Sequence, residues 1–284
     1  MKRRGLILRK VQQKIFDAAC LAAVTLSVAL MFWIIATLFR HGFAVINWEL
    51  LTEPSKPYGI PHQGIANALL GTVLITSVAT LLAVPLGLAG GIYLAEYDRH
   101  STLADLVRLS ANVLMGIPSI VIGLFVYAVW VVPTGHFSGW AGSIALAIIM
   151  VPIILRTTED MLLLVPDTMR ESALALGISR WRTTLSVVCR SCRSGLVTGV
   201  LLAFARICGE TAPLLFTALW SHSWPSAFFS TPVANMPVLI TEYMTASPFE
   251  EQQKIGWAAA TVMLAIILIL NITLRTVFHR KRAL

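Results

Sequence analysis

One arginine and one glutamate lie four residues apart inside an apolar stretch, at Arg206 and Glu210. The stretch covers residues 201–218, and an ionised side chain at membrane depth costs about 2.5–3.5 kcal/mol on insertion scales. A helix places positions i and i+4 on one face, within reach of each other. One interpretation is a structural ion pair that locks this helix to its neighbours. The interpretation we favour is a polar lining for the passage of an anion, because charges within membrane spans by default indicate function.

The other reactive residues do not form a catalytic or metal-binding pattern. Cys189 and Cys192 have CxxC spacing, but neither a second CxxC nor a neighbouring histidine pair accompanies them. We interpret Cys20 and Cys208 as small apolar residues within spans. The sequence contains no P-loop, nucleophile elbow or His-Glu-x-x-His motif. The chain is therefore expected to be no enzyme and to hold no cofactor or metal, and any ATP binding requires another chain.

The composition indicates a membrane protein. Hydrophobic residues make up 57% of the 284 residues and charged residues only 13%. A helix needs roughly 20 apolar residues to cross the hydrocarbon core of a bilayer. Six stretches predict such spans, and with them an all-α polytopic fold: 18–39, 66–95, 110–132, 140–155, 195–220 and 256–278.

Some residues within these stretches predict how the helices continue, bend and pack. The fourth stretch is short, so we expect its helix to continue beyond Arg156 into the aqueous phase. Prolines inside the spans predict bends, at Pro85, Pro118 and Pro152. The GxxxG spacings at 87–91 and 195–199 permit close contact between helices.

The positions of the basic residues predict the orientation in the membrane. Most of the 22 Lys and Arg residues fall in the N-terminus, in segments 96–109 and 156–194 and in the C-terminus. The opposite side holds only Arg40, Lys56 and Lys254. Because cytoplasmic loops carry such an excess, we expect both termini to be cytoplasmic. The net charge of +8 is then a feature of topology and gives no reason to expect nucleic-acid binding.

The chain divides into a basic cytoplasmic N-terminus (1–17), a membrane domain (18–278) and a basic tail (279–284). The membrane domain includes the loop 156–194. The first span is longer than the apolar region of a signal peptide and no clear cleavage site follows it, so we interpret it as a retained anchor that contacts membrane lipid.

The loop between the fourth and fifth spans has the pattern of two short helices. Thr168 and Glu171 have capping-box spacing for the start of the first helix. Gly177 lies where a left-handed helix stop is expected, and Ser179 would cap a second helix that carries Trp181. An amphipathic segment on lipid headgroups accounts for the arginines and the tryptophan. A docking surface for a soluble partner accounts for the glycine turn as well.

The residues 171–177, Glu-Ser-Ala-Leu-Ala-Leu-Gly, resemble the EAA motif of bacterial ABC importer permeases. In that family a short coupling helix fits a groove on a separate ATPase subunit. Further segments, in order along residues 64–270, resemble the permeases of phosphate-specific importers: 64–72, 92–97, 116–120, 156–159, 165–171 and 209–216. Two departures are Ser172 in place of alanine, and Cys189-Arg190 where the family usually has Leu-Pro. The missing proline is expected to remove a kink before the fifth span.

The resemblance implies a type I ABC importer permease fold in a bacterial inner membrane. It implies an ATPase-coupling role for Glu171, Ala173, Gly177, Ser179 and Trp181, and a substrate pathway at Arg206, Glu210 and Thr211. The implied partners are a sister permease, a dimer of ATP-binding subunits, a periplasmic phosphate-binding protein and inorganic phosphate.

Three alternatives remain at this point. The chain length, residues 93–97 and the short loop at 133–138 favour one of the two permeases of the importer over its sister. A permease for another oxyanion is not distinguished by physics alone. A secondary carrier or channel is less favoured, because internal repeats and paired broken helices are weak here and the docking loop would have no purpose.

Overall fold

The computed structural model describes residues 2–99 and 101–280, and every regular element within them is a helix. Residue 1 and residues 281–284 of the predicted basic tail lie outside the described residues. The elements in chain order are α1 (Lys2–Gly42), α2 (Trp48–Thr52), α3 (Ala66–Ile92), η1 (Tyr93–Tyr97), α4 (Thr102–Gly116), α5 (Ser119–Val126), η2 (Tyr127–Val131), α6 (Val132–Thr134), α7 (Gly139–Leu163), α8 (Asp167–Ala175), α9 (Arg180–Arg182), η3 (Thr183–Val188), α10 (Cys189–Ser191), α11 (Arg193–Cys208), α12 (Ala212–Leu215), α13 (Met236–Thr241), η4 (Glu242–Ala246) and α14 (Glu250–Arg280), where η denotes a π-helical turn.

The described chain holds four helices that are long and apolar enough to cross a membrane: Gln12–Gly42, Ala66–Tyr97, Gly139–Leu163 and Glu250–Thr273. Two bent helix pairs, Thr102–Gly116 with Ser119–Thr134 and Arg180–Ser191 with Arg193–Cys208, bring the number to six if each pair is one span. The predicted all-helical fold with about six spans is confirmed.

The third predicted span, 110–132, is wrong as a single straight helix. α4 and α5 meet at an angle of 102°. Between them Ile117 is extended, with φ −72° and ψ 132°, and Pro118 is the N-cap of α5. A proline has no N–H to continue the helix and disfavours the helical conformation of the residue before it. The bend expected at Pro118 is therefore a complete break in the helix.

The approach to the fifth span also differs from the prediction. The helices on either side of Cys192 are bent by 75°, although the chain has Arg190 where the family has proline. The expectation that the missing proline removes a kink is wrong. Only the short helix α10 separates the bend from η3, and a π-helical turn disturbs the hydrogen-bond pattern of a helix without any proline.

The fifth span also ends earlier than the predicted residue 220. α11 stops at Cys208, Gly209 is its C-cap, and the next helix, α12, has Pro213 in its first turn. Glycine has low helix propensity and proline cannot donate the backbone hydrogen bond, so the chain turns between these residues. Glu210 consequently lies outside the helix that carries Arg206.

α7 is the central helix of the bundle and, as expected, continues beyond Arg156 to Leu163. Its contact with α3 is the most extensive between helices in the described chain. A Cβ atom on Gly87 of α3 would lie 2.7 Å from the Cβ of Ile154, and one on Gly199 of α11 would lie 2.7 Å from the hydroxyl of Thr157. These glycines let α3 and α11 approach α7 closely, as their GxxxG spacing predicts.

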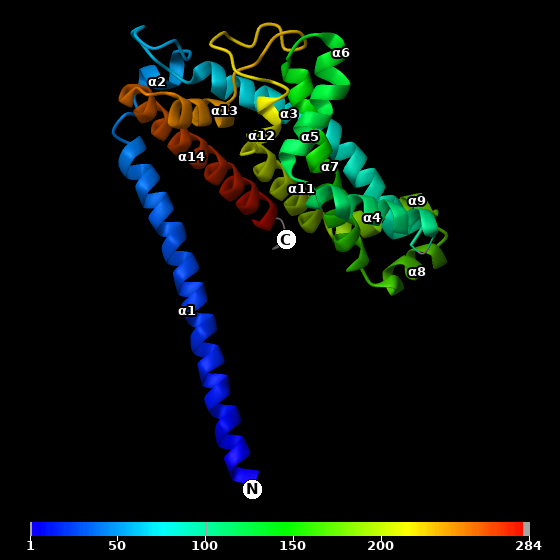
Figure 1. The fold of residues 1–284 in the computed structure, drawn as a ribbon. Helices are drawn as coiled ribbons and strands as arrows, with labels where there is room; N and C mark the ends of the chain where they lie inside the picture. The colour runs from blue at the N-terminus through cyan, green and yellow to red at the C-terminus, as the bar shows by residue number, and fades with distance from the viewer. Residues whose placement is uncertain (1, 100, 281–284) are drawn as a thin grey trace.

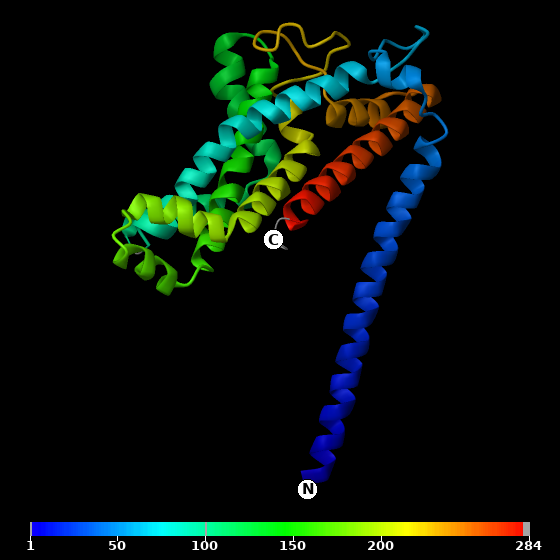
Figure 2. The ribbon, with the colours of Figure 1, turned by 180° about the vertical axis from the view of Figure 1, so that it is seen from behind.

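Helix α1 stands away from the rest of the molecule, as Figures 1 and 2 show from opposite sides. It meets α14 near its C-terminal end, where the hydroxyl of Thr261 donates to the carbonyl of Leu38 at 2.9 Å and His41 stacks on Trp257. None of its most apolar 18-residue stretch is buried within the chain. Its apolar surface is therefore left for lipid or for another subunit.

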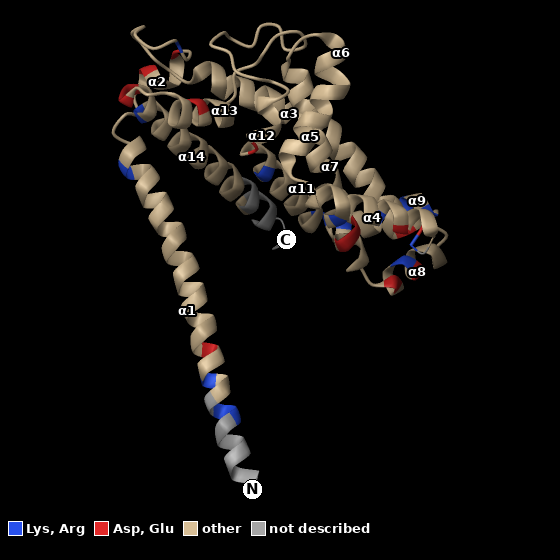
Figure 3. Ribbon diagram, viewed as in Figure 1, with Lys and Arg blue, Asp and Glu red and all other residues tan. Residues whose placement is uncertain are grey.

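The molecule has two distinct ends. α8 and α9 lie at one end, and α2, α6 and α13 lie at the other (Figure 1). The first half of α1 and the last turns of α14 extend toward the side of α8 and α9 (Figure 1). Figure 3 shows charged residues near these ends and along α1, and a basic and an acidic segment beside each other near α11 and α12.

Candidate anion pathway and docking loop

The Arg206–Glu210 pair forms at the point where α11 ends. The Nε atom of Arg206 lies 3.7 Å from Oε1 of Glu210, which is an ion-pair distance beyond hydrogen-bond length. The Arg206 side chain is 55% exposed and that of Glu210 is 18% exposed. The predicted contact is therefore present, but the expectation of two residues on one continuous helix is wrong, because the helix ends at Cys208.

A small hollow adjoins Arg206 where α4, α5, α7 and α11 converge. The hollow has a volume of about 10 Å³, which is room for about one water molecule. Arg206 and Ser119 are the polar residues among those that line it: Leu114, Met115, Ile117, Ser119, Ile122, Ile149, Ile153 and Arg206. An oxyanion larger than water would pass here only if these helices separated.

Thr211, the third residue predicted for the pathway, lies in the turn directly after Glu210. It is the N-cap of α12, and its carbonyl accepts hydrogen bonds from the amides of Leu214 and Leu215 at 3.0 and 3.2 Å. Its side chain makes no capping hydrogen bond. Thr211 therefore directly follows Glu210, the acidic member of the pair, and its hydroxyl is not used for capping.

The docking loop has the helix–glycine–helix form that was expected, with a different start. α8 begins at Asp167 after Pro166, so Thr168 is already helical and its predicted capping box is wrong. The rigid φ of proline favours a helix start directly after it, and Asp167 in the first turn suits the helix dipole. Gly177 has φ +77°, which confirms the predicted left-handed stop.

The remaining loop residues divide into one that is buried and several that face outward. Ala173 is buried, with 6% of its surface exposed, whereas Glu171 is exposed. Ser179 occupies the N-cap of α9, as predicted, but its side chain makes no capping hydrogen bond. Trp181 is 55% exposed and Leu176 is 80% exposed. The loop therefore presents apolar side chains outward beside an acidic one.

Sequence reasoning missed the most buried charges of the bundle. Glu159 of α7 is 2% exposed and binds two arginines: the Nε of Arg108 in α4 donates at 2.7 Å, and Nη1 of Arg156 donates at 2.6 Å. Arg108 also pairs with the exposed Asp105 at 2.8 Å. A glutamate in an apolar helix could have been recognised from the sequence as a candidate buried charge. Its partner Arg108 lies 51 residues earlier and could not have been recognised in this way.

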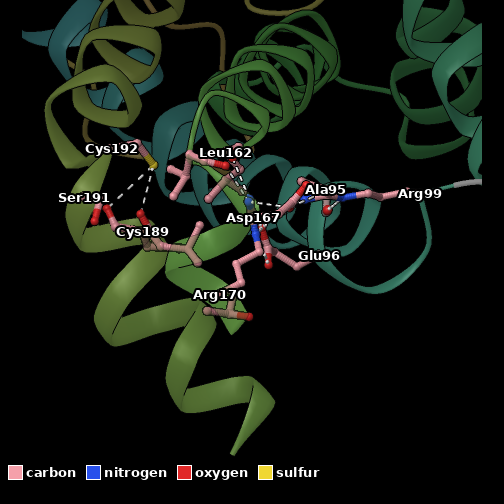
Figure 4. A network of polar contacts seen from close by, with 12 residues as sticks. Ala95, Glu96, Arg99, Leu162, Asp167, Arg170, Cys189, Ser191 and Cys192 are labelled. Carbon is pink, nitrogen blue, oxygen red and sulfur yellow. Dashed lines mark hydrogen bonds and ion pairs between the residues drawn. The ribbon is translucent and has the colours of Figure 1, made fainter. Parts of the chain in front are cut away.

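A second missed network joins the docking loop to the end of α3. Figure 4 shows Arg170 of α8 among Glu96, Asp167 and Leu162. Arg170 and Glu96 approach to 2.7 Å with side chains 11% and 6% exposed. The hydrogen bonds with Glu96 raise the pKa of Arg170 above its ordinary value, although burial acts in the opposite direction. Arg170 therefore stays charged throughout the physiological range.

Comparisons with known proteins agree with this architecture. Residues 87–283 match the family model described as binding-protein-dependent transport system inner membrane component. The phosphate transport system permease protein PstA of Pasteurella multocida is 44% identical over 96% of both chains. That of Haemophilus influenzae is 43% identical over 96% of both chains, and PstA 1 of Mycobacterium tuberculosis is 31% identical over 97% of this chain and 91% of its own.

A solved structure supports the fold. An inward-facing form of the MetNI methionine ABC transporter matches with a TM-score of 0.61 at 16% identity, over 74% of this chain and 93% of that one. At this identity the likeness concerns the arrangement of helices alone. Together with the matched family model and the relatives, it identifies a multi-pass protein of the bacterial inner membrane. The chain belongs to the family of binding-protein-dependent transport system inner membrane components, in which the relatives named above are PstA permeases.

Proposed function

We propose that this chain is one of two membrane subunits of an ATP-driven importer of inorganic phosphate. A sister permease would form the other half of the pathway, and a dimer of ATP-binding subunits would supply the energy. A periplasmic phosphate-binding protein would deliver the substrate. The proposal is supported by the family, by the names of the relatives and by their identity of 43–46% over most of the chain. Those names favour this subunit over the sister permease.

The observation that carries the substrate assignment is the half-exposed guanidinium of Arg206 in an apolar part of the bundle. A guanidinium offers a planar set of donors that matches the oxygens of phosphate. Glu210 lies at 3.7 Å, close enough to moderate the charge without occupying the donors through hydrogen bonds. Phosphate would replace this weak contact as it passes Arg206, with Thr211 at the edge of its route.

The docking loop would take up the movement of the ATP-binding subunits. Glu171 and Trp181 are exposed, Gly177 sets the direction of the chain between α8 and α9, and Ala173 fixes α8 against the protein. Ser179 lies at the start of α9. These positions suit a short helix that fits a groove on a partner, which is the role that the EAA-like residues imply.

We further propose that both termini and the 156–194 loop face the cytoplasm, with 1–17 and 279–284 as basic ends of the membrane domain 18–278. Charge asymmetry supports this orientation. So does the position of the α14 end and the first half of α1 on the side of α8 and α9 (Figure 1). In a Ser179→Cys variant, a membrane-impermeant thiol reagent should label residue 179 in inverted vesicles and leave it unlabelled in intact cells. Labelling from outside intact cells would overturn both the orientation and the docking role.

The function is tested by reconstitution. The chain is co-expressed with a sister permease and an ATP-binding subunit of a phosphate importer, and the complex is placed in liposomes with the binding protein. We expect ATP-dependent uptake of labelled phosphate that excess sulfate does not inhibit. Omission of the ATP-binding subunit serves as the control and should abolish uptake. Uptake of another oxyanion in preference to phosphate, or uptake without ATP, would contradict the proposal.

A further inference from the structure

One arginine of the docking loop, Arg170, is attached to the end of α3 through a carboxylate. Its Nε donates to both carboxylate oxygens of Glu96, at 3.0 and 3.2 Å, and its Nη2 donates to Oε1 at 2.7 Å. Glu96 belongs to η1, which continues α3 without a break. The two residues are 74 positions apart in the sequence, so this contact joins two distant segments.

The same guanidinium also caps the carboxyl end of α7. Its Nη2 donates to the carbonyl of Leu162 at 2.8 Å, and its Nη1 donates to the carbonyl of Val165 at 2.5 Å. α7 ends at Leu163, and the last carbonyls of a helix have no partner within it. One side chain therefore holds three elements together, α8, η1 and the end of α7.

Apolar packing contributes little to the contact between α8 and η1. A hollow of about 480 Å³ lies there, lined mainly by charged and polar residues that include Glu96, Asp167, Arg170 and Arg180. Arg180, beyond Gly177, adds a second tie, since its Nη2 donates to the carbonyl of Glu96 at 2.5 Å and its guanidinium lies over the ring of Tyr97. Both helices of the loop are thus held to η1 by arginines.

Burial of this pair points to a role in positioning. Replacing a buried ion pair by apolar residues is often neutral or stabilising, so such a pair is weak grounds for stability alone. A bidentate contact between a guanidinium and a carboxylate does fix distance and direction. The pair therefore serves best where α8 must keep one orientation relative to α3 and α7.

The helices that the pair joins lead to the candidate pathway. α3 and α7 pack along each other so closely that a Cβ atom added to Gly91 of α3 would lie 2.6 Å from the carbonyl oxygen of Leu155 in α7. Two side chains of α7, Ile149 and Ile153, line the hollow beside Arg206. A displacement of α8 that is passed to α7 would thus reach the surroundings of Arg206 through packed helices.

We propose that Arg170 and Glu96 are positioning residues of the transport cycle, which lock α8 to α7 and α3 so that movement of α8 opens and closes the region beside Arg206. The pair transmits movement; it does not contact phosphate or form the surface that binds the ATP-binding subunit. This inference rests on the proposed coupling role of the loop.

The test compares three variants of the complete complex: Glu96→Gln, Arg170→Lys and, as a matched control, Asp167→Asn. Asp167 accepts from Nη1 of Arg170 at 3.0 Å but is 66% exposed, so its loss should have little effect. Arg170→Lys keeps the positive charge and removes the fork, which guards against simple misfolding. Three quantities are measured: the amount of ATP-binding subunit that co-purifies, ATP hydrolysis stimulated by the phosphate-loaded binding protein, and phosphate uptake.

We expect both pair variants to retain the ATP-binding subunit at the wild-type ratio. Stimulated hydrolysis and uptake should each fall about tenfold, within the range seen for residues that couple distant sites. The double variant should be no worse than the poorer single variant, because the two residues act through one contact. Asp167→Asn should behave as wild type.

Wild-type uptake in both single variants would overturn the proposal, as would an equal loss in Asp167→Asn. Loss of the co-purified ATP-binding subunit would also overturn it, because the pair would then shape the docking surface. If even the wild-type complex fails to hold an ATP-binding subunit, the proposed function fails together with this inference. If wild type couples normally and the pair variants do too, the function stands and only the role of the pair is lost.

Discussion

The C-terminal end of α7 and that of α11 each carry charged side chains, but these differ in how tightly they are paired and how far they are buried. Near the carboxyl end of α7, Glu159 binds two arginines at 2.6 and 2.7 Å and is 2% exposed. At the end of α11, Arg206 lies 3.7 Å from Oε1 of Glu210 and is 55% exposed. Both carboxylate oxygens of Glu159 are bonded within the protein, whereas the guanidinium of Arg206 keeps donors that can bind something else.

The two kinds of pairing suit different tasks: tight pairs hold helices in a fixed arrangement, and the loose pair can exchange one partner for another. Short, charge-assisted hydrogen bonds fix a geometry, and breaking them leaves a buried charge unpaired. A longer contact at a partly exposed position contributes little, typically below about 1 kcal/mol, and gives way easily to a competing anion. The tight networks therefore suit the transmission of movement, and the loose pair suits the passage of phosphate.

The largest effect is expected at the loose pair. Arg206→Gln removes the charge that attracts phosphate, so uptake by the assembled complex should fall about a hundredfold, equivalent to roughly 3 kcal/mol in the barrier. Arg206→Lys keeps the charge without the planar fork and should lose about tenfold. Uptake of labelled phosphate in proteoliposomes measures both. Wild-type uptake by Arg206→Gln would remove Arg206 from the pathway.

A smaller effect, on stability rather than on transport alone, is expected at the tight network. Glu159→Gln leaves Arg108 and Arg156 without their shared carboxylate. Because Arg108 is 21% exposed and Arg156 is 28% exposed, we expect the free energy of unfolding to fall by about 2–3 kcal/mol, below the 3–5 kcal/mol typical of fully buried pairs. Thermal unfolding of the purified complex should shift down by roughly 5–10 °C.

The matched control for that variant is Asp105→Asn, since Asp105 contacts the same Arg108 but is 73% exposed. This variant should lower the free energy of unfolding by less than about 0.5 kcal/mol. Equal shifts in the two variants would show that burial does not distinguish these contacts, and the comparison between tight and loose pairs would lose its basis.

The smallest effect on stability is expected in the docking loop. Gly177 has φ +77°, a conformation that β-branched residues adopt only under strain, so Gly177→Val should cost at least about 1 kcal/mol locally. The permease should still insert into the membrane, while co-purification of the ATP-binding subunit or transport-coupled hydrolysis is lost. Gly59, which has φ +87° in a loop at the opposite end, offers a control: Gly59→Val should leave both unchanged. Normal coupling in Gly177→Val would assign the loop another purpose.

Several features that depend on local sequence were predicted correctly. The apolar stretches gave the spans, the continuation of α7 beyond Arg156 followed from a stretch too short to cross a bilayer, and the stop at Gly177 followed from glycine after a helix-forming run. In each case the physical cause lies within a few neighbouring residues.

Other features depend on context that a single sequence does not contain. Pro118 breaks its helix completely, whereas Pro85 and Pro152 remain inside α3 and α7, although all three lie in apolar stretches. The candidate pair at 206 and 210 was found because both members are close in sequence. The contact of Arg170 with Glu96 was not, because only the folded chain brings together residues 74 positions apart.

The central claim is that Arg206 contacts the transported anion and is not merely part of an ion pair. The most direct test is the charge swap Arg206→Glu with Glu210→Arg, which keeps a pair at this junction but moves the guanidinium off α11. Phosphate uptake is measured on a complex shown to contain all its subunits. The account predicts that uptake falls about as far as in Arg206→Gln, by roughly a hundredfold. Uptake by the swapped complex at the wild-type rate would contradict it and leave the pair a device for helix packing.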